Sequence, residues 1–315
     1  MKIVAQASLG KAQIVERLKA SPGADVRVVD DAAAAIRELP DADALVCVDF
    51  FYSAEIAAAA GAAKGLRAIQ LLTAGYDRVA QYGAPAGVPV CNAGEAYAPA
   101  VATHALALLL ALQRQVPAIL ADQPKHAWER GFAPRLTTPA SGATAVIGLG
   151  PIGLEIARLL RAFGARVVGV NRSGTPNAAV DETCAVAALA SVLPRVEAIV
   201  LALPLTPDSR HLLGAREFAL CRKSAVVVNV ARGAVMDQNA LAEALGRGLI
   251  AGAAVDVTEP EPLPPEHPLW NAPNLILSPH CAGACGPSAG ERLAALAGDN
   301  IDRLARGEPL RHVVA

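Results

Sequence analysis

Three side chains that can bind a carboxylate or transfer a proton lie in the second half of the chain. Arg232, Glu261 and His280 each follow a run of β-branched and aliphatic residues typical of a buried strand. A guanidinium binds a carboxylate through two parallel hydrogen bonds and polarises an adjacent carbonyl. An imidazole exchanges a proton near neutral pH, and a neighbouring carboxylate fixes its tautomer and favours its charged form. The three residues therefore predict acid–base chemistry on a carboxylate substrate, of the kind that accompanies hydride transfer.

A glycine-rich stretch over residues 145–153 predicts a dinucleotide site. It is an apolar run that stops at glycines and continues into a helical pattern, and a second strand pattern over 166–170 completes a β-α-β unit. The first glycine permits a tight turn, the second lets the backbone approach a pyrophosphate, and the third lets the helix pack closely on the strand. The N–H groups of the first helical turn attract the anion. The predicted contacts here are Gly148, Gly150, Pro151, Ile152 and Gly153.

The end of the second strand indicates which dinucleotide is bound. Asn171, Arg172 and Ser173 stand where an NAD-binding unit carries an acidic residue for the ribose hydroxyls. A guanidinium and a hydroxyl can bind a 2′-phosphate that a carboxylate would repel. We therefore expect NADP in preference to NAD. The alternative is that Arg172 is a solvated loop charge beside a site that takes either dinucleotide.

The elements that must position these residues follow an α/β pattern. Four further buried-strand runs lie after the β-α-β unit, and in a doubly wound sheet their ends line one edge, where the chemistry belongs. These runs cover residues 198–204, 225–230, 252–256 and 274–278. The first hundred residues also alternate short apolar runs with Ala-rich helical patterns, which predicts a second parallel sheet covered by helices.

Two other segments carry specific expectations. Residues 101–120 predict one long helix that is apolar on nearly every face and therefore buried all round. Phe50, Phe51 and Tyr52 gather at one strand end in a chain poor in aromatic residues. They could line a pocket for a bulky substrate side chain, or form a small buried cluster under a loop.

Composition restricts the remaining possibilities. The chain has 315 residues, enough for two domains, and a net charge of -1, which gives no sign of a nucleic-acid-binding face. No apolar segment is long enough to span a bilayer or to act as a signal peptide, so we expect a cytoplasmic protein. The six cysteines include no C-x-x-C pair. Cys281 and Cys285 follow His280 too loosely to predict a metal site, and we expect none.

With these motifs, the chain resembles the D-isomer-specific 2-hydroxyacid dehydrogenase family over nearly its whole length. The segments that carry the resemblance are Thr73-Ala-Gly-Tyr-Asp77, Val146-Ile-Gly-Leu-Gly150, Leu203-Pro-Leu-Thr-Pro207, Asn229-Val-Ala-Arg-Gly233, Asp256-Val-Thr-Glu-Pro-Glu-Pro262 and Ser278-Pro-His280. The family consists of NAD(P)-dependent oxidoreductases of the EC 1.1.1 class, commonly dimers. The resemblance therefore implies reduction of a 2-oxo acid to the D-2-hydroxy acid, and a homodimer.

The resemblance also implies roles for individual residues. Arg232 would bind the substrate carboxylate, Glu261 would orient His280, and His280 would be the acid or base. The backbone turn at Ala74 and Gly75 would receive the substrate carboxylate. Further dinucleotide contacts would come from Pro204, Ala231 and Asp256, the last through the nicotinamide carboxamide.

The implied fold has two Rossmann-like domains, each a parallel sheet with helices on both faces. The substrate domain is discontinuous, formed by residues 1–99 and 285–315, and residues 100–284 form the dinucleotide-binding domain. Two residues depart from the family pattern: Thr103 replaces a common Glu, and Cys281 stands where an aliphatic residue is usual. Cys281 suggests sensitivity to thiol reagents.

A second hypothesis is a dinucleotide-sensing protein similar to the corepressors to which the family resemblance also extends. Such a protein would bind dinucleotide and change its assembly without significant turnover. All three catalytic residues are present here, and nothing resembles a nucleic-acid-binding extension, so the enzyme is the first hypothesis.

Overall fold

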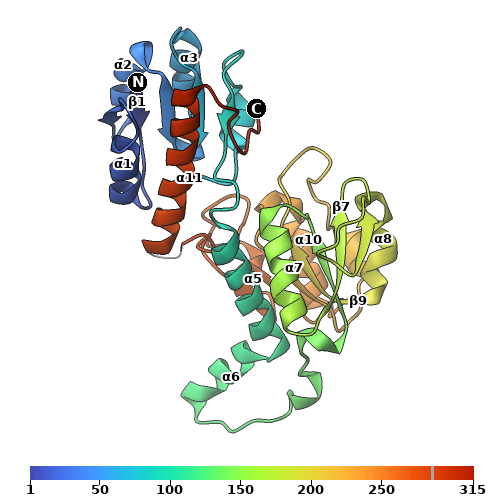
Figure 1. Cartoon of the computed structure of the whole chain (residues 1–315). Helices are drawn as coiled ribbons and strands as arrows, with labels where there is room; N and C mark the ends of the chain where they lie inside the picture. The colour runs from blue at the N-terminus through green and yellow to red at the C-terminus, as the bar shows by residue number, and fades with distance from the viewer. Residues whose placement is uncertain (285–286) are drawn as a thin grey trace. The chain divides into compact units, whose positions relative to one another are not determined.

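The computed structural model describes residues 1–284 and 287–315, and it divides into two compact units (Figure 1). The first unit is Met1–Tyr97 with Ala284–Ala315, and the second is Ala98–Gly283. The predicted boundaries lie within two residues of these. That the first unit binds substrate and the second binds the dinucleotide stays a prediction.

The described part of the first unit contains a parallel sheet of five strands in the order β2-β1-β3-β4-β5. The strands are β1 Lys2–Ala5, β2 Asp25–Val28, β3 Ala44–Cys47, β4 Ala68–Leu71 and β5 Val90–Cys91. The helices are α1 Lys11–Lys19, α2 Ala32–Glu38, α3 Ala54–Ala62, α4 Asp77–Tyr82 and α11 Pro287–Arg306. Strands β3 and β4 are buried along their whole length, as expected for a parallel sheet covered on both faces.

The last helix returns to the first unit and completes its core. α11 packs against α1, and its side chains Leu293, Ala297 and Ile301 join the apolar cluster around β1. Beyond this helix, the Val314 N–H donates to the Val90 carbonyl of β5 at 2.8 Å. The N-terminal sheet therefore depends on residues from the far end of the sequence.

The described part of the second unit contains a parallel sheet of seven strands in the order β12-β11-β10-β9-β6-β7-β8. The strands are β6 Ala143–Ile147, β7 Arg166–Asn171, β8 Glu182–Ala185, β9 Val196–Leu201, β10 Val226–Asn229, β11 Gly252–Val255 and β12 Leu275–Leu277. The helices are α5 Ala98–Gln113, α6 Val116–Asp122, α7 Pro151–Ala162, α8 Leu189–Val192, α9 Ala215–Leu220 and α10 Gln238–Gly246. The direction of strand addition reverses between β6 and β9, which is the topological switch point where doubly wound sheets bind ligands.

The prediction of one continuous helix over 101–120 is wrong. The chain breaks between α5 and α6 at Gln115, whose φ of 56° lies in the left-handed region. Pro117 follows closely and favours a new helix start. α5 buries a broad face, but Ile119 and Leu120 on α6 are 47% and 59% exposed. The prediction that this segment is buried on every side is therefore wrong: α5 is buried on part of its surface, and α6 has no buried residue.

Strand β8 was not predicted from the sequence, and Tyr52 decides between the two alternatives given for the aromatic residues. β8 is a half-exposed edge strand of mixed polarity, so it lacks the apolar run that identified the other strands. Tyr52 is completely buried, and its hydroxyl donates to the Gly83 carbonyl at 3.0 Å. It belongs to the core of the first unit and cannot line a substrate pocket, whereas Phe50 is 69% exposed.

No single helix among the described residues has the length and apolar character needed to cross a membrane. By length and composition alone, α5 meets that requirement together with the helical segment Val116–Lys125, and the chain bends by 63° between them.

A close contact between two glycines supports a stability prediction. A Cβ on Gly290 of α11 would lie 2.9 Å from the Cα of Gly10, which precedes α1. We expect Gly290→Ala to lower the free energy of unfolding by about 1–3 kcal/mol, because backbone must move to accommodate the methyl group. Gly61→Ala in α3 is the matched control: its Cβ would meet nothing within 4 Å, and better helix propensity should add up to about 1 kcal/mol. Urea unfolding of both variants tests this, and equal stability would contradict it.

Candidate active site

The glycine turn after β6 has the geometry that a pyrophosphate site requires. Gly148 has a φ of 98°, and a Cβ there would lie 2.4 Å from the Ala202 carbonyl oxygen. A Cβ on Gly153 would lie 1.8 Å from the Gly148 oxygen, so the first turn of α7 closes directly on the loop. Gly150 is the N-cap of α7 and faces open space, which leaves room for an anion at the helix N-terminus. Pro151 and Ile152 begin the helix as predicted.

The loop after β7 carries a cation and no acidic residue. Asn171 closes the loop on itself, donating to the Thr175 carbonyl and accepting from the Gly174 N–H. Ser173 and Arg172 are exposed, and the Arg172 guanidinium makes no hydrogen bond or ion pair with any residue that the structure describes. No Asp or Glu occurs over residues 171–180. These features fit a dinucleotide whose ribose carries a phosphate.

Asn229, the last residue of β10, fixes the backbone that presents Arg232. Its completely buried amide accepts from the Ala231 N–H at 3.0 Å and donates to the Arg232 carbonyl at 3.0 Å. The Arg232 guanidinium in turn donates to the Ala231 carbonyl at 2.7 Å. The sequence analysis assigned Asn229 no role, although a polar residue that ends a buried strand run is a signal for one. Pro204, another predicted dinucleotide contact, lies in the loop that follows β9, and it is exposed.

Gly233 brings the loop of Arg232 against the loop that carries Glu261. A Cβ at Gly233 would lie 2.1 Å from the carbonyl carbon of Thr258, so only glycine fits. Glu261 then accepts from the Thr258 N–H at 2.9 Å, and its other oxygen lies 2.7 Å from the Nδ1 of His280. The structure therefore brings the predicted Glu261–His280 pair together, in direct contact.

The charges around this pair shift both pKa values. The hydrogen bond with Glu261 raises the pKa of His280 above its ordinary value, against partial burial and the charge of Arg232, which act to lower it. Partial burial acts to raise the pKa of Glu261, but the hydrogen bonds from His280 and Thr258, with the charges of His280 and Arg232, lower it overall. Arg232 is close enough to act on both groups. The pair therefore favours imidazolium beside carboxylate.

Asp256 anchors the loop that presents His280. This carboxylate is buried, and it accepts from the Cys281 N–H and the Ala282 N–H at 3.0 Å each. The Ser278 hydroxyl donates to it at 2.5 Å. The His280 N–H donates to the Asp256 carbonyl at 2.7 Å, with His280 at a φ of 50°. The carboxylate also lies 3.3 Å from the Nε2 of His104 on α5. The predicted contact of Asp256 with nicotinamide stays a prediction.

In the first unit, the turn after β4 leaves two backbone N–H groups without an acceptor among the described residues. The Thr73 hydroxyl donates to the Gly75 carbonyl at 2.8 Å, and the Asn92 amide donates to the Ala74 carbonyl at 2.8 Å. The N–H groups of Ala74 and Gly75 donate to no group in the described part of the chain. Such N–H groups can bind an anion, but carboxylate binding by this turn stays a prediction.

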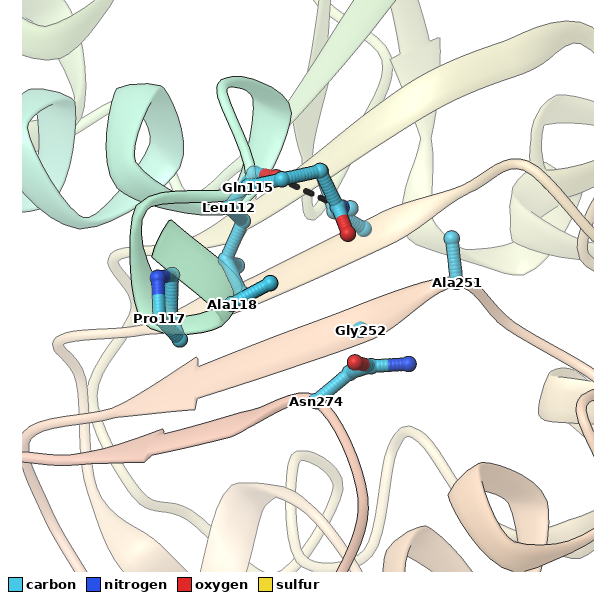
Figure 2. A pocket seen from close by; sticks show the side chains of 8 residues that line it. Leu112, Gln115, Pro117, Ala118, Ala251, Gly252 and Asn274 are labelled. Atoms are coloured by element: carbon cyan, nitrogen blue, oxygen red, sulfur yellow. Dashed lines mark hydrogen bonds between the residues drawn. The ribbon is translucent and has the colours of Figure 1, made fainter. Parts of the chain in front are cut away.

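A small cavity in the second unit lies away from these residues. Figure 2 shows Leu112, Gln115, Pro117 and Ala118 on one side, with Gly252 and Asn274 on the other. Gly252 begins β11 and Asn274 precedes β12, so the cavity lies at the amino ends of the strands. Ligands of doubly wound sheets bind at the carboxyl ends, and this cavity is therefore not the dinucleotide site.

The chain is similar in sequence to proteins of one known family. The family model described as "D-isomer specific 2-hydroxyacid dehydrogenase, NAD binding domain" matches residues 106–282. The glyoxylate reductase of Aeropyrum pernix is 34% identical over 252 residues, which cover 77% of this chain and 74% of that protein.

Two solved structures share the whole fold. The NADPH-dependent glyoxylate/hydroxypyruvate reductase of Sinorhizobium meliloti, in complex with NADP and sulfate, matches with a TM-score of 0.85 and 29% identity over 99% of this chain and 97% of that one. A D-isomer specific 2-hydroxyacid dehydrogenase of Xanthobacter autotrophicus, in complex with NADPH and MES, matches with a TM-score of 0.86 and 28% identity over 100% and 97% of the two chains.

The contact between Glu261 and His280 can be tested without any assay of turnover. We expect Glu261→Gln to lower the pKa of His280, because a neutral amide replaces the charged acceptor that favours imidazolium. An NMR titration of the imidazole measures this. Glu259→Gln is the matched control, since Glu259 lies in the same loop but pairs with Arg210. An unchanged His280 pKa in Glu261→Gln would show that the contact does not persist in solution.

Proposed function

Because the chain belongs to the D-isomer-specific 2-hydroxyacid dehydrogenase family, we propose that it reduces a small 2-oxo acid to the D-2-hydroxy acid with NADPH. Membership of this family makes it an oxidoreductase with an NAD-binding domain. The observation that carries the proposal is the 2.7 Å contact between Glu261 and His280, within electrostatic range of Arg232. These are the acid–base pair and the cation that such a reduction needs.

Each protein group has a defined part in the proposed reaction. The bound dinucleotide supplies the hydride. Arg232 holds the substrate carboxylate and polarises the adjacent carbonyl. His280 donates a proton to the carbonyl oxygen from Nε2, because its Nδ1 is engaged by Glu261. Glu261 keeps the imidazole charged and oriented, and Asn229 fixes the backbone on either side of Arg232.

The raised pKa of His280 gives the pH dependence its sign. The reduction uses the protonated imidazole, which persists to higher pH than it would for an isolated histidine. The rate of reduction should therefore fall as the pH rises through the His280 pKa, and this fall should come at a higher pH than for an isolated histidine.

We propose small acids such as glyoxylate or hydroxypyruvate as substrates. Bulkier acids such as phenylpyruvate are the alternative that the aromatic residues after β3 would favour if they lined a pocket, but Tyr52 is buried in the core. The glyoxylate reductase and the glyoxylate/hydroxypyruvate reductase described above support the smaller class.

Preference for NADPH over NADH rests on the loop after β7. Arg172 is exposed and unengaged among the described residues, and no carboxylate lies near it in the sequence. The structures from S. meliloti and X. autotrophicus contain NADP and NADPH, which supports the same choice.

A homodimer in the cytoplasm is part of the proposal. α6 and the loop after it run out from the end of α5 (Figure 1), and they carry the exposed apolar side chains Ile119, Leu120 and Trp128. Such side chains are suited to burial against a second copy. A monomer in sedimentation equilibrium would contradict the proposed dimer.

The proposed cytoplasmic location is supported by the cysteines. Cys47, Cys91, Cys184, Cys221 and Cys281 are free, as in a reducing compartment.

Replacement of Arg232 distinguishes the enzyme from the dinucleotide-sensing alternative. We expect Arg232→Ala to lower kcat/KM for glyoxylate about 100-fold or more, because the substrate loses its cation. Dinucleotide affinity, measured by fluorescence titration, should change little. Arg222→Ala is the control, since Arg222 lies before the start of β10 and forms an ion pair with Glu197. A sensor would instead give no turnover in the unaltered protein and retain dinucleotide-dependent assembly in the variant.

Replacement of Arg172 tests the choice of dinucleotide. We expect Arg172→Ala to raise the KM for NADPH about 10- to 100-fold, which corresponds to loss of a hydrogen bond between charged groups. The KM for NADH in the same variant serves as the internal control and should stay unchanged. Equal effects on both dinucleotides would remove the argument for a 2′-phosphate contact.

A further inference from the structure

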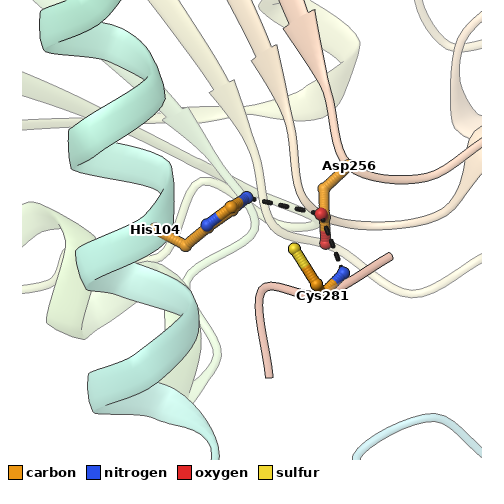
Figure 3. A group of neighbouring side chains, drawn as sticks. All are labelled: His104, Asp256 and Cys281. Atoms are coloured by element: carbon orange, nitrogen blue, oxygen red, sulfur yellow. Dashed lines mark hydrogen bonds and ion pairs between the residues drawn. The ribbon is translucent and has the colours of Figure 1, made fainter. Parts of the chain in front are cut away.

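Three side chains with metal-binding atoms converge beside the loop of His280. His104 comes from α5, Asp256 follows β11, and Cys281 follows β12, and all three belong to the second unit (Figure 3). One imidazole nitrogen, one carboxylate oxygen and the thiol sulfur lie within 4.8 Å of one another. The sequence analysis grouped Cys281 with His280 and Cys285 instead. Cys285 lies outside the described residues, and His104 is far from Cys281 in the sequence.

The spacing of these atoms is close to what a tetrahedral metal ion needs. With metal–ligand distances of about 2.0–2.3 Å, tetrahedral coordination sets the ligand atoms about 3.3–3.8 Å apart. The Nε2 of His104 and the Oδ1 of Asp256 are 3.3 Å apart. Cys281 is exposed, so a rotation of its side chain can bring the sulfur in by the remaining distance.

The Ser278 hydroxyl marks the point toward which the three groups are directed. It lies 2.5 Å from the Asp256 carboxylate, 3.0 Å from the His104 Nε2 and 3.3 Å from the Cys281 sulfur. An atom near this point can therefore contact all three groups at once. A metal ion there would take the hydroxyl as a further ligand or displace it.

Backbone contacts already hold the carboxylate in place for this role. The N–H groups of Cys281 and Ala282 bind the two oxygens of Asp256, and the residue is 2% exposed. Outer contacts of this kind orient metal ligands and raise the affinity of metal sites. Imidazole, carboxylate and thiolate together favour zinc and similar ions over magnesium or calcium, which prefer oxygen alone.

We propose that His104, Asp256 and Cys281 bind a zinc-class divalent transition-metal ion, with a water or the Ser278 hydroxyl as the fourth ligand. This replaces the expectation of no metal site. A bound ion would be coordinated by the carboxylate that anchors the His280 loop. It would also hold the side chain of Cys281, which is the residue after His280. We therefore expect zinc to inhibit the reaction reversibly. This inhibition rests on the proposed function, but binding of the ion is independent of it.

Cobalt titration of the full chain, without dinucleotide or substrate, tests the binding. Co²⁺ bound to a thiolate gives a charge-transfer absorption in the near ultraviolet, and four-coordinate Co²⁺ gives intense visible bands. We expect both at one ion per chain. Cys281→Ser should abolish the charge-transfer band, and His104→Gln should weaken binding at least about 10-fold. Circular dichroism of each variant verifies that it is folded.

Cys184→Ser is the matched control, because Cys184 is a half-buried thiol of the same unit that lies beside Glu182. It should leave the cobalt spectrum unchanged. A charge-transfer band that persists in Cys281→Ser, or a wild-type protein that gives none, would overturn the proposal.

Zinc inhibition distinguishes the metal-site proposal from the reductase proposal. Turnover with NADPH and glyoxylate should fall on addition of Zn²⁺ and return with a chelator, and in Cys281→Ser the inhibited fraction, relative to that variant's own rate, should be smaller. A cobalt spectrum without turnover of any 2-oxo acid would leave the metal site in place and reject the reductase. Turnover without a cobalt spectrum would support the reductase and reject the metal site.

Discussion

The buried carboxylate of Asp256 is the constraint on which the candidate active site of the second unit depends. A charge at this depth is stable only if donors surround it. Here the donors are the Ser278 hydroxyl and the N–H groups of Cys281 and Ala282, all from one short segment. Each hydrogen bond to a charged group contributes about 1.5–3 kcal/mol. Satisfying this one carboxylate therefore fixes the segment that includes His280, and with it the position of the imidazole relative to Glu261.

The same edge balances opposite electrostatic effects on His280. Glu261 raises the imidazole pKa through a hydrogen bond, and the Arg232 charge lowers it. In the proposed reaction, the substrate carboxylate would neutralise Arg232. The imidazole would then lose a repulsion and hold its proton more firmly while substrate binds, so the arrangement prepares the acid form at the time when it is needed.

The sequence predicted much of the fold because parallel strands that are buried on both faces produce continuous apolar runs. The same reasoning grouped Arg232, Glu261 and His280, since the carboxyl ends of such strands share one edge. It missed β8, whose edge position requires no apolar run, and the break at Gln115, which depends on a single backbone angle. It left open whether Phe50, Phe51 and Tyr52 line a pocket or form a buried cluster, because a run of aromatic residues does not tell which of them faces the core.

The supporting residues of the site were harder to predict. Asn229 acts through its amide on backbone two and three residues away, a contact that becomes visible only when the turn is built. His104 and Ser278 are 174 residues apart in sequence and meet only because α5 packs against the sheet. No local pattern carries that information, whereas the glycine turn was predictable because its three glycines act within nine residues.

The discontinuity of the first unit has a consequence for synthesis on the ribosome. The second unit is continuous in sequence, so all of Ala98–Gly283 is translated before α11, and its sheet uses no strand from beyond Gly283. The first unit is translated earlier but lacks Leu293, Ala297 and Ile301 of its core until then. Its five strands must therefore wait, with part of their apolar face uncovered. Until α11 is available, the apolar side chains around β1 that it covers stay accessible, and such surface makes an incomplete chain prone to aggregation.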